Sequence, residues 1–144
     1  MRLGIVGHEA AKFTPETEEQ ARQEIRKAIH AHGATEVVSG SCHLGGIDIW
    51  AVEEANKLGL NTVEFAPQVL RWDPPGKTGF KLRNLQIAKY SDVVLCIVVE
   101  KIPHTYTGMR FNDCYHCQGR NPPHIKSGGC WTAWRAKSRE WVVL

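Results

Sequence analysis

The sequence lacks any long hydrophobic run. Its longest apolar stretch, residues 93–99, is a strand's length, far short of the roughly 18–20 residues that span a bilayer. The first residues, Arg2-Leu3-Gly4-Ile5-Val6-Gly7, are typical of a strand rather than of a signal peptide. The net charge of +3 is too small to indicate a nucleic-acid or membrane partner by itself. We find no internal repeat and no low-complexity tract. These absences predict a protein with no membrane partner.

Cysteine is present but in an odd number. Five cysteines in a chain without an export signal favour a reducing compartment, so we expect a cytoplasmic protein without disulfides. A chain of 144 residues that is 42% hydrophobic and 23% charged can bury a core without such cross-links. Its length predicts one domain over residues 1–144.

Strand-like and helix-like segments alternate along the chain. The predicted strands are residues 3–6, 36–38, 61–65, 92–99 and 141–144. The predicted helices are one that begins at Pro15 after the cap Thr14 and stops at Gly33, followed by residues 47–58, 79–90 and 130–138. This alternation predicts an α/β fold, a three-layer Rossmann-like parallel sheet with helices on both faces. The most apolar strand, residues 92–99, should be central, and residues 101–126 should form a long inserted loop with Cys and His.

Two glycine-bearing turns each open a predicted helix. One is residues 40–48, Gly-Ser-Cys-His-Leu-Gly-Gly-Ile-Asp, and the other is residues 127–132, Ser-Gly-Gly-Cys-Trp-Thr. A helix N-terminus offers unpaired N–H groups and partial positive charge, so it can hold a phosphate. In a parallel sheet both turns, with Gly7-His8, would lie at the carboxyl edge, where such folds bind ligands. We therefore predict one shared site for a phosphate-bearing ligand.

Several side chains are candidates for that site, each with a structural alternative. Asp48 would contact the ligand, at a ribose hydroxyl for example, or only bond backbone N–H groups at its helix start. The guanidinium of Arg83 suits phosphate, with Asn84 beside it, or the pair is a surface arginine and a structural asparagine. His8 would donate to phosphate or act as a general acid, or it is a loop histidine with neither role. The predicted ligand-binding residues are Gly7, His8, Gly40, Ser41, Gly45, Gly46, Asp48, Arg83, Asn84, Ser127, Gly128, Gly129 and Thr132.

Whether the protein is an enzyme stays open at this stage. Glu53 or Glu54 would stabilise an oxocarbenium-like transition state if the chain cleaves an N-glycosidic bond, or both are solvated helix-surface residues. The catalytic candidates are therefore Asp48, Glu54 and His8. Trp72, in a proline-rich loop, would stack on a base or only pack at the rim of the site.

A second pattern of chemical interest is Cys114-x2-Cys117-x6-His124-x5-Cys130. Two thiolates two residues apart can face one ion, and a histidine with a third cysteine completes a tetrahedral zinc set. A loop with little apolar content cannot order itself by core burial, so a structural zinc would explain its folding. His104 or His116 could replace Cys130 as a ligand. The alternative is a set of surface thiols or a redox pair.

Taken in order, these motifs resemble the SLOG superfamily, which includes Smf-type DNA-processing proteins, LOG phosphoribohydrolases and molybdenum-cofactor carriers. The segments that carry the resemblance are residues 39–55, 80–88, 91–95 and 127–133, covering Ser-Gly…Gly-Ile-Asp, Arg-Asn-x-x-Ile-Ala, the strand after it, and the Gly-Gly…Thr turn. The resemblance implies a nucleotide-binding Rossmann-like domain that often pairs, hence a homo-oligomer.

The sequence departs from the LOG enzymes at one informative place. When Gly128 and Thr132 are aligned with the LOG motif, Arg135 stands at the catalytic glutamate and Trp131 at a glycine. The resemblance therefore favours a carrier, sensor or binding protein for a nucleotide or nucleotide-derived ligand. The alternatives are an N-glycosidase or phosphoribohydrolase-type hydrolase or transferase, and a single-stranded DNA-binding protein of the Smf kind. The weak positive charge does not favour the last.

Overall fold

The fold is built on one sheet of five parallel strands. A computed structural model describes residues 1–111 and 113–144. The strands are β1 (Arg2–Gly7), β2 (Glu36–Ser39), β3 (Asn61–Glu64), β4 (Val93–Val98) and β5 (Arg139–Val143). Their spatial order is β3-β2-β1-β4-β5, and every neighbouring pair is parallel. The chain thus winds in one direction from β1 to β3 and in the other from β1 to β5.

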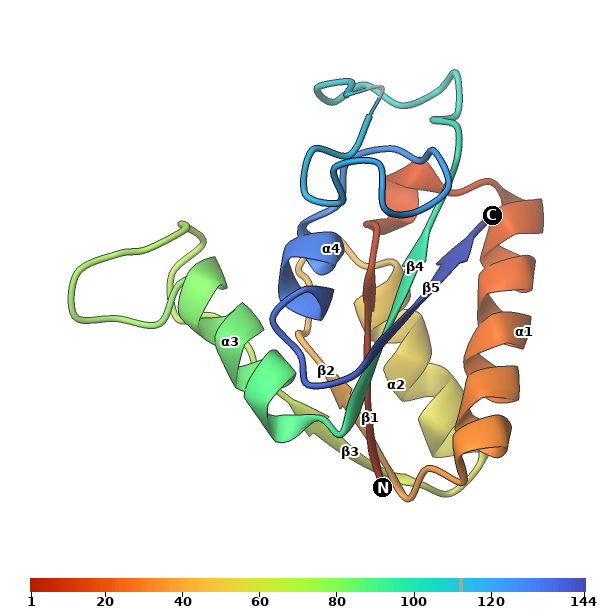
Figure 1. The fold of residues 1–144 in the computed structure, drawn as a ribbon, viewed down its shortest axis with the longest axis vertical. Coiled ribbons are helices and arrows are strands. Elements are labelled where there is room, and N and C mark those ends of the chain that lie inside the picture. The colour runs from red at the N-terminus through yellow and green to blue at the C-terminus, as the bar shows by residue number, and fades with distance from the viewer. Residues whose placement is uncertain (112) are drawn as a thin grey trace.

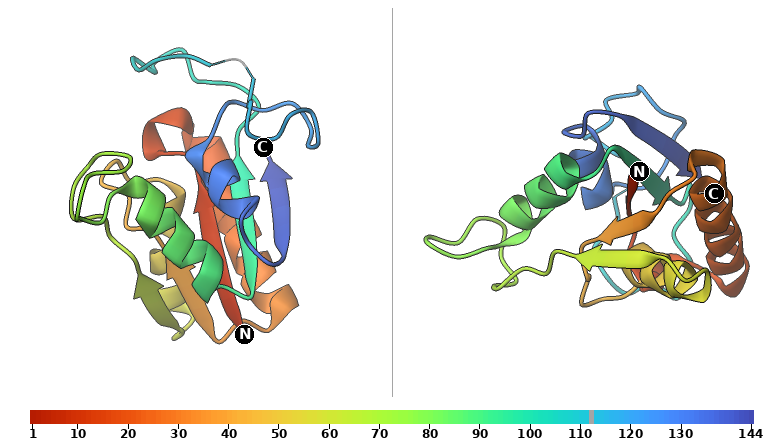
Figure 2. Two further views of the ribbon diagram at one scale, coloured as in Figure 1. Left: turned by 60° about the vertical axis from the view of Figure 1, so that its left-hand side comes forward. Right: turned by 90° about the horizontal axis from the view of Figure 1, so that it is seen from below.

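Helices cover both faces of this sheet, as Figures 1 and 2 show. They are α1 (Pro15–His32), α2 (Ile47–Lys57), α3 (Phe80–Tyr90) and α4 (Gly128–Ala133), preceded by a short 3-10 turn, η1 (Ala10–Lys12). The pair α1 and α2 packs on one face, and α3 with α4 packs on the other. The predicted three-layer α/β class is confirmed.

Local sequence signals explain the longest helix. Thr14 caps α1 by accepting a hydrogen bond from the backbone N–H of Thr17, and the Thr17 hydroxyl oxygen in turn accepts the backbone N–H of Thr14. Pro15 fits the first helical position, where no N–H is needed. Gly33 ends the helix with a φ of +60°, a conformation that other residues adopt at a cost.

Each face of the sheet has its own hydrophobic core. Leu3 and Ile5 of β1 point toward α1 and α2, whereas Val6 points toward α3 and α4. β4 alternates in the same way and is buried over its last five positions. It was predicted to be central because of this apolar character. The middle strand is in fact β1, and β4 lies between β1 and β5.

Three predicted boundaries were wrong near the C-terminus. The last helix begins at Gly128 rather than at residue 130 and ends at Ala133 rather than at residue 138. It begins early because Ser127 caps it by accepting a hydrogen bond from the Gly129 N–H. β5 begins at Arg139, two residues earlier than expected, where it pairs with Val94 of β4.

The five cysteines are free thiols, four of them buried. Among the described residues, no helix combines the length and the apolar character that crossing a bilayer requires.

Candidate ligand cavity and metal centre

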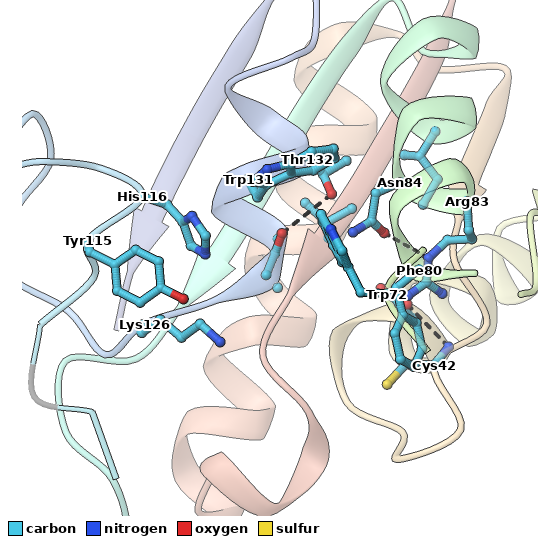
Figure 3. Close-up of a pocket in the computed structure, with 16 residues that line it drawn as sticks. Cys42, Trp72, Phe80, Arg83, Asn84, Tyr115, His116, Lys126, Trp131 and Thr132 are labelled. Carbon is cyan, nitrogen blue, oxygen red and sulfur yellow. Dashed lines mark hydrogen bonds between the residues drawn. The ribbon is translucent and has the colours of Figure 1, made fainter. Parts of the chain in front are cut away.

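A cavity of about 450 Å³ opens at the carboxyl edge of the sheet, next to the end of β1 (Figure 3). The winding reverses between β1 and β4, and open α/β sheets bind ligands at that point. The cavity is lined by Val6, Gly7, Cys42, Asp48, Trp72, Phe80, Arg83, Asn84, Ile87, Tyr115, His116, Lys126, Gly128, Gly129, Trp131 and Thr132.

Glycines let the start of α4 approach the end of β1. A Cβ atom placed on Gly129 would lie 2.8 Å from the backbone nitrogen of Gly7, which is closer than real contacts allow. A Cβ on Gly128 would meet nothing within 4 Å, so its backbone is open on that side. The predicted second glycine turn therefore lines the cavity at Gly128 and Gly129, while Ser127 is buried and caps the helix.

The buried carboxyl group of Asp48 and the buried guanidinium of Arg83 lie together at one end of the cavity. Arg83 donates from Nε to Oδ1 of Asn84 at 2.7 Å and from Nη1 to the carbonyl of Gly40. Asp48 accepts the N–H of Cys42 at 3.2 Å. Burial raises the pKa of Asp48 to about 6, although the nearby charge of Arg83 opposes that shift. The predicted Asp48, Arg83 and Asn84 thus come together at the cavity.

Aromatic rings form the next part of the lining. The rings of Trp72 and Trp131 meet edge to face with centroids 4.8 Å apart, and Phe80 lies close by (Figure 3). Arg135 stacks on the Trp131 ring with its guanidinium carbon 3.6 Å from the centroid. Arg135, which stands where the LOG enzymes have their catalytic glutamate, therefore packs on an aromatic ring of the cavity and supplies no carboxylate. Trp72 is 47% exposed, so a large part of its ring is free to meet a ligand.

The inserted loop supplies the opposite side. Tyr115, His116 and Lys126 lie across the cavity from Arg83 and Asn84 (Figure 3). The Lys126 ammonium lies 5.8 Å from the centroid of the Tyr115 ring. The sequence reasoning missed these three as ligand contacts, because a loop gives no periodicity from which to tell which side chains point inward.

The first glycine turn contributes less than predicted. The N–H of Gly45 donates to the carbonyl of Cys42, and the N–H of Ile47 donates to the carbonyl of His8. Gly46 packs against the backbone of residues 8–10. Ser41 donates its hydroxyl to Glu64. Only Cys42 and Asp48 of residues 40–48 line the cavity. Of the two glycine turns that were predicted to bind phosphate through their N–H groups, only the turn at Gly128 and Gly129 therefore brings glycine backbone to the cavity.

His8 is not part of the cavity lining and holds backbone segments together. Its Nδ1 accepts the N–H of Val99, and its Nε2 lies 3.1 and 3.0 Å from the carbonyls of Ile125 and Lys126. This pattern requires a proton on Nε2 and a neutral ring. Burial lowers the pKa of His8 to about 4, which suits a structural histidine better than a general acid near neutral pH.

Glu54 lies in the interface between α1 and α2 rather than at the cavity. Its carboxylate is fully buried and contacts Arg22 at 2.9 Å, Lys57 at 3.0 Å, and Arg26. Glu53 contacts Arg22 at 3.1 Å and is half exposed. Despite its burial, the pKa of Glu54 is lowered to about 2 by hydrogen bonds from these cations, first from Arg26. The contacts give both glutamates a structural explanation.

The four predicted metal ligands meet in one buried cluster. The ligand atoms of Cys114, Cys117, His124 and Cys130 lie within 4.8 Å of one another. Nε2 of His124 is 3.5 Å from the sulfur of Cys117 and 3.4 Å from that of Cys130. Tetrahedral zinc with ordinary bond lengths would separate nitrogen and sulfur ligands by about 3.6 Å. The group could therefore hold a metal ion, with Cys130 rather than His104 or His116 as its last member.

Hydrogen bonds from and to neighbouring groups orient these four side chains in a way that suits a bound cation. Nδ1 of His124 lies 2.7 Å from the carbonyl of Pro122, which places the proton there and leaves the Nε2 lone pair toward the sulfurs. The side chains of Asn121 and Trp141 donate N–H groups to the sulfurs of Cys117 and Cys130. A hydrogen bond from the Cys130 thiol, aided by backbone N–H groups, lowers the pKa of Cys114 well below that of an ordinary thiol. That thiolate is suited to bind metal.

Together, the fold and these groups define a class: a Rossmann-like α/β protein with a cavity at the switch point of its sheet and a Cys3His cluster in the adjoining loop. The sequence matches no protein-family model and no curated protein at a significant level.

Proposed function

We propose that this protein binds a phosphate-bearing nucleotide, or a nucleotide-derived ligand, in the cavity at the carboxyl edge of its sheet, and that it is a SLOG-type carrier or sensor. One observation carries the proposal: the cavity combines aromatic rings with a net positive charge at the switch point. The lining contains two cationic side chains, Arg83 and Lys126, and one carboxyl group, that of Asp48. Such a site favours a flat, anionic ligand.

The lining suggests how the parts of a nucleotide would be divided. Lys126 and the open backbone at Gly128 would receive the phosphate. The rings of Trp72 and Trp131 offer a surface for the base. The carboxylate of Asp48 would accept from a sugar hydroxyl at the far end.

We propose zinc as the metal of the Cys3His cluster. Three thiolates with one imidazole form a common structural zinc set, and the nitrogen–sulfur separations fit its tetrahedral geometry. The expected occupancy is one zinc per chain for protein purified without chelators. Cys114→Ser should lose most of that zinc. Cys42→Ser, which changes a cysteine outside the cluster, should retain it, and equal zinc content in the two variants would contradict the assignment.

Isothermal titration of the zinc-loaded protein with AMP, GMP, CMP and UMP tests the binding proposal. We expect at least one of them to bind one-to-one. Lys126→Gln should weaken that binding by about tenfold or more, because it removes a charge-assisted contact to phosphate. The matched control is Lys101→Gln, at an exposed position of the same loop that does not line the cavity. Equal affinity in both variants, or no binding of any monophosphate, would reject the proposal.

A second candidate function is hydrolysis of a nucleotide at its C1′ carbon. The observation that favours it is Asp48, a cavity carboxyl group whose pKa near 6 suits proton transfer at neutral pH. Release of free base from any of the four monophosphates, abolished in Asp48→Asn, would support this candidate. Tight binding without released base leaves the binding protein as the better description.

A further inference from the structure

The cavity and the Cys3His cluster share the same short pieces of chain. Tyr115 and His116 lie between the cluster residues Cys114 and Cys117, and both line the cavity. Figure 3 shows their rings side by side along one flank of the cavity. A Cys-x2-Cys turn closed on a metal would therefore fix the positions of two ligand-contacting side chains.

The other end of the cluster connects to the cavity in the same way. Cys130 lies in the first turn of α4, directly after Gly129 and directly before Trp131, which both line the cavity. A metal bound between Cys114, Cys117, His124 and Cys130 thus joins the loop flank of the cavity to its α4 flank.

Other parts of the loop are anchored by Tyr106 to Glu9 and by Ile125 and Lys126 to His8, but the Cys-x2-Cys turn has few other buried contacts. Of residues 101–111 and 113–123, only Cys114 and Cys117 are buried. The stacking of Arg120 on Trp134, at 3.6 Å, is one further contact to the body of the protein. The two main hydrophobic cores are built mostly from the sheet and its helices, and Cys114, Cys117 and Cys130 join the second of them. Loss of the metal should therefore release residues 114–117 while the sheet stays folded.

We infer that the Cys3His cluster controls ligand binding: the metal it holds positions Tyr115 and His116 as one wall of the cavity, so that nucleotide affinity depends on metal occupancy. This inference rests on the proposed nucleotide site. The dependence is reciprocal, because any factor by which the metal raises nucleotide affinity must also be the factor by which the nucleotide raises metal affinity.

The test is a linkage measurement on the full chain. It uses zinc and the tightest-binding of AMP, GMP, CMP and UMP. Titration of the zinc-loaded and the chelator-stripped protein should show at least a tenfold loss of affinity without zinc, in the usual range for coupled sites. Far-ultraviolet circular dichroism of the stripped protein should keep its α/β signal. Competition with a chromophoric chelator should then show zinc held more tightly, by the same factor, when the monophosphate is saturating.

Variants that keep all four cluster residues extend the test, even if the stripped protein unfolds. Tyr115→Ala and His116→Ala should each keep one zinc per chain and lose affinity for the monophosphate, about tenfold together. His104→Ala, at an exposed position of the same loop outside the cavity, should bind normally.

The outcomes separate the two proposals. Equal affinity with and without zinc, or unchanged binding by the zinc-loaded Tyr115→Ala and His116→Ala variants, overturns the coupling and leaves nucleotide binding in place. Absence of binding by the zinc-loaded wild-type protein overturns both.

Discussion

At the scale of single residues, two carboxyl groups of one helix have different roles because their surroundings differ. Asp48 and Glu54 belong to one helix and were both candidates for chemistry from sequence. The structure places Asp48 in the cavity, where burial raises its pKa, and Glu54 among three cations, which lower it. No sequence pattern could distinguish these two environments, because the arginines that set them, Arg22 and Arg26 for Glu54 and Arg83 for Asp48, come from other helices.

Asp48→Asn should make the protein more stable and less able to bind nucleotide. The folded pKa of Asp48, about 6, lies above its unfolded value, so the ionised carboxylate destabilises the fold at higher pH. Removing that charge should raise the free energy of unfolding at pH 8 by up to about 3 kcal/mol, with little gain at pH 4. Urea denaturation at both pH values measures this change.

The matched control for this change is Asp73→Asn, at an exposed aspartate in a 3.6 Å contact with Lys81. Its stability should stay within about 0.5 kcal/mol of wild type. A loss of stability at pH 8 in Asp48→Asn would show that the carboxylate serves the fold rather than a ligand.

His8→Gln should lower stability near neutral pH, with an effect that shrinks in acid. The folded pKa of His8, about 4, lies below the unfolded value of 6.5, so the unfolded chain binds more protons between those values. The stabilisation from the neutral ring is fully present above pH 6.5 and is lost as the pH falls toward 4.

The stability difference between wild type and His8→Gln should therefore narrow by about 2 kcal/mol from pH 7 to pH 5. Paired denaturant titrations at the two pH values, with zinc content matched, give this number. A constant difference would mean that the ring is not held neutral.

At the scale of elements, alternation of apolar strands and amphipathic helices was enough to predict the layers. All five strands and four helices exist close to their expected places, because burial against both faces of a parallel sheet leaves a clear pattern. The Cys3His group was also predictable, because the residue types that bind zinc and their spacing can be seen directly in the sequence. The early start of α4 follows from the local cap at Ser127, whereas its close approach to Gly7 is a tertiary contact that the sequence pattern does not show.

The contact between α1 and α2 should depend on Glu54 far more than on its neighbour. Glu54→Gln leaves Arg22, Arg26 and Lys57 facing each other without their shared carboxylate. We expect a loss of about 2 kcal/mol, below the usual cost of breaking a buried pair because Arg26 and Lys57 reach solvent. Nucleotide affinity should not change.

Glu53→Gln is the control, because it alters a half-exposed carboxylate that contacts the same Arg22. Thermal unfolding of both variants should show a clear drop in Tm only for Glu54→Gln. Equal drops would contradict the assigned role of the buried carboxylate.

At the scale of the whole molecule, the inserted loop is an addition to the parallel sheet and its covering helices. It folds over the carboxyl edge at the top of Figure 1 and closes the cavity from the side opposite α3. Its inward-facing residues, Tyr115, His116 and Lys126, were not predicted as ligand contacts. The glycine turn at residues 40–46 was predicted to bind phosphate, but only Cys42 of that turn lines the cavity, and the N–H groups of Cys42 and Gly45 bond within the protein.

The most direct test of the account is native mass spectrometry of protein purified without chelators, with each of AMP, GMP, CMP and UMP added in turn at up to millimolar concentration. The account predicts a chain carrying one zinc that takes up one monophosphate. A chain that takes up zinc but none of the four nucleotides would contradict it.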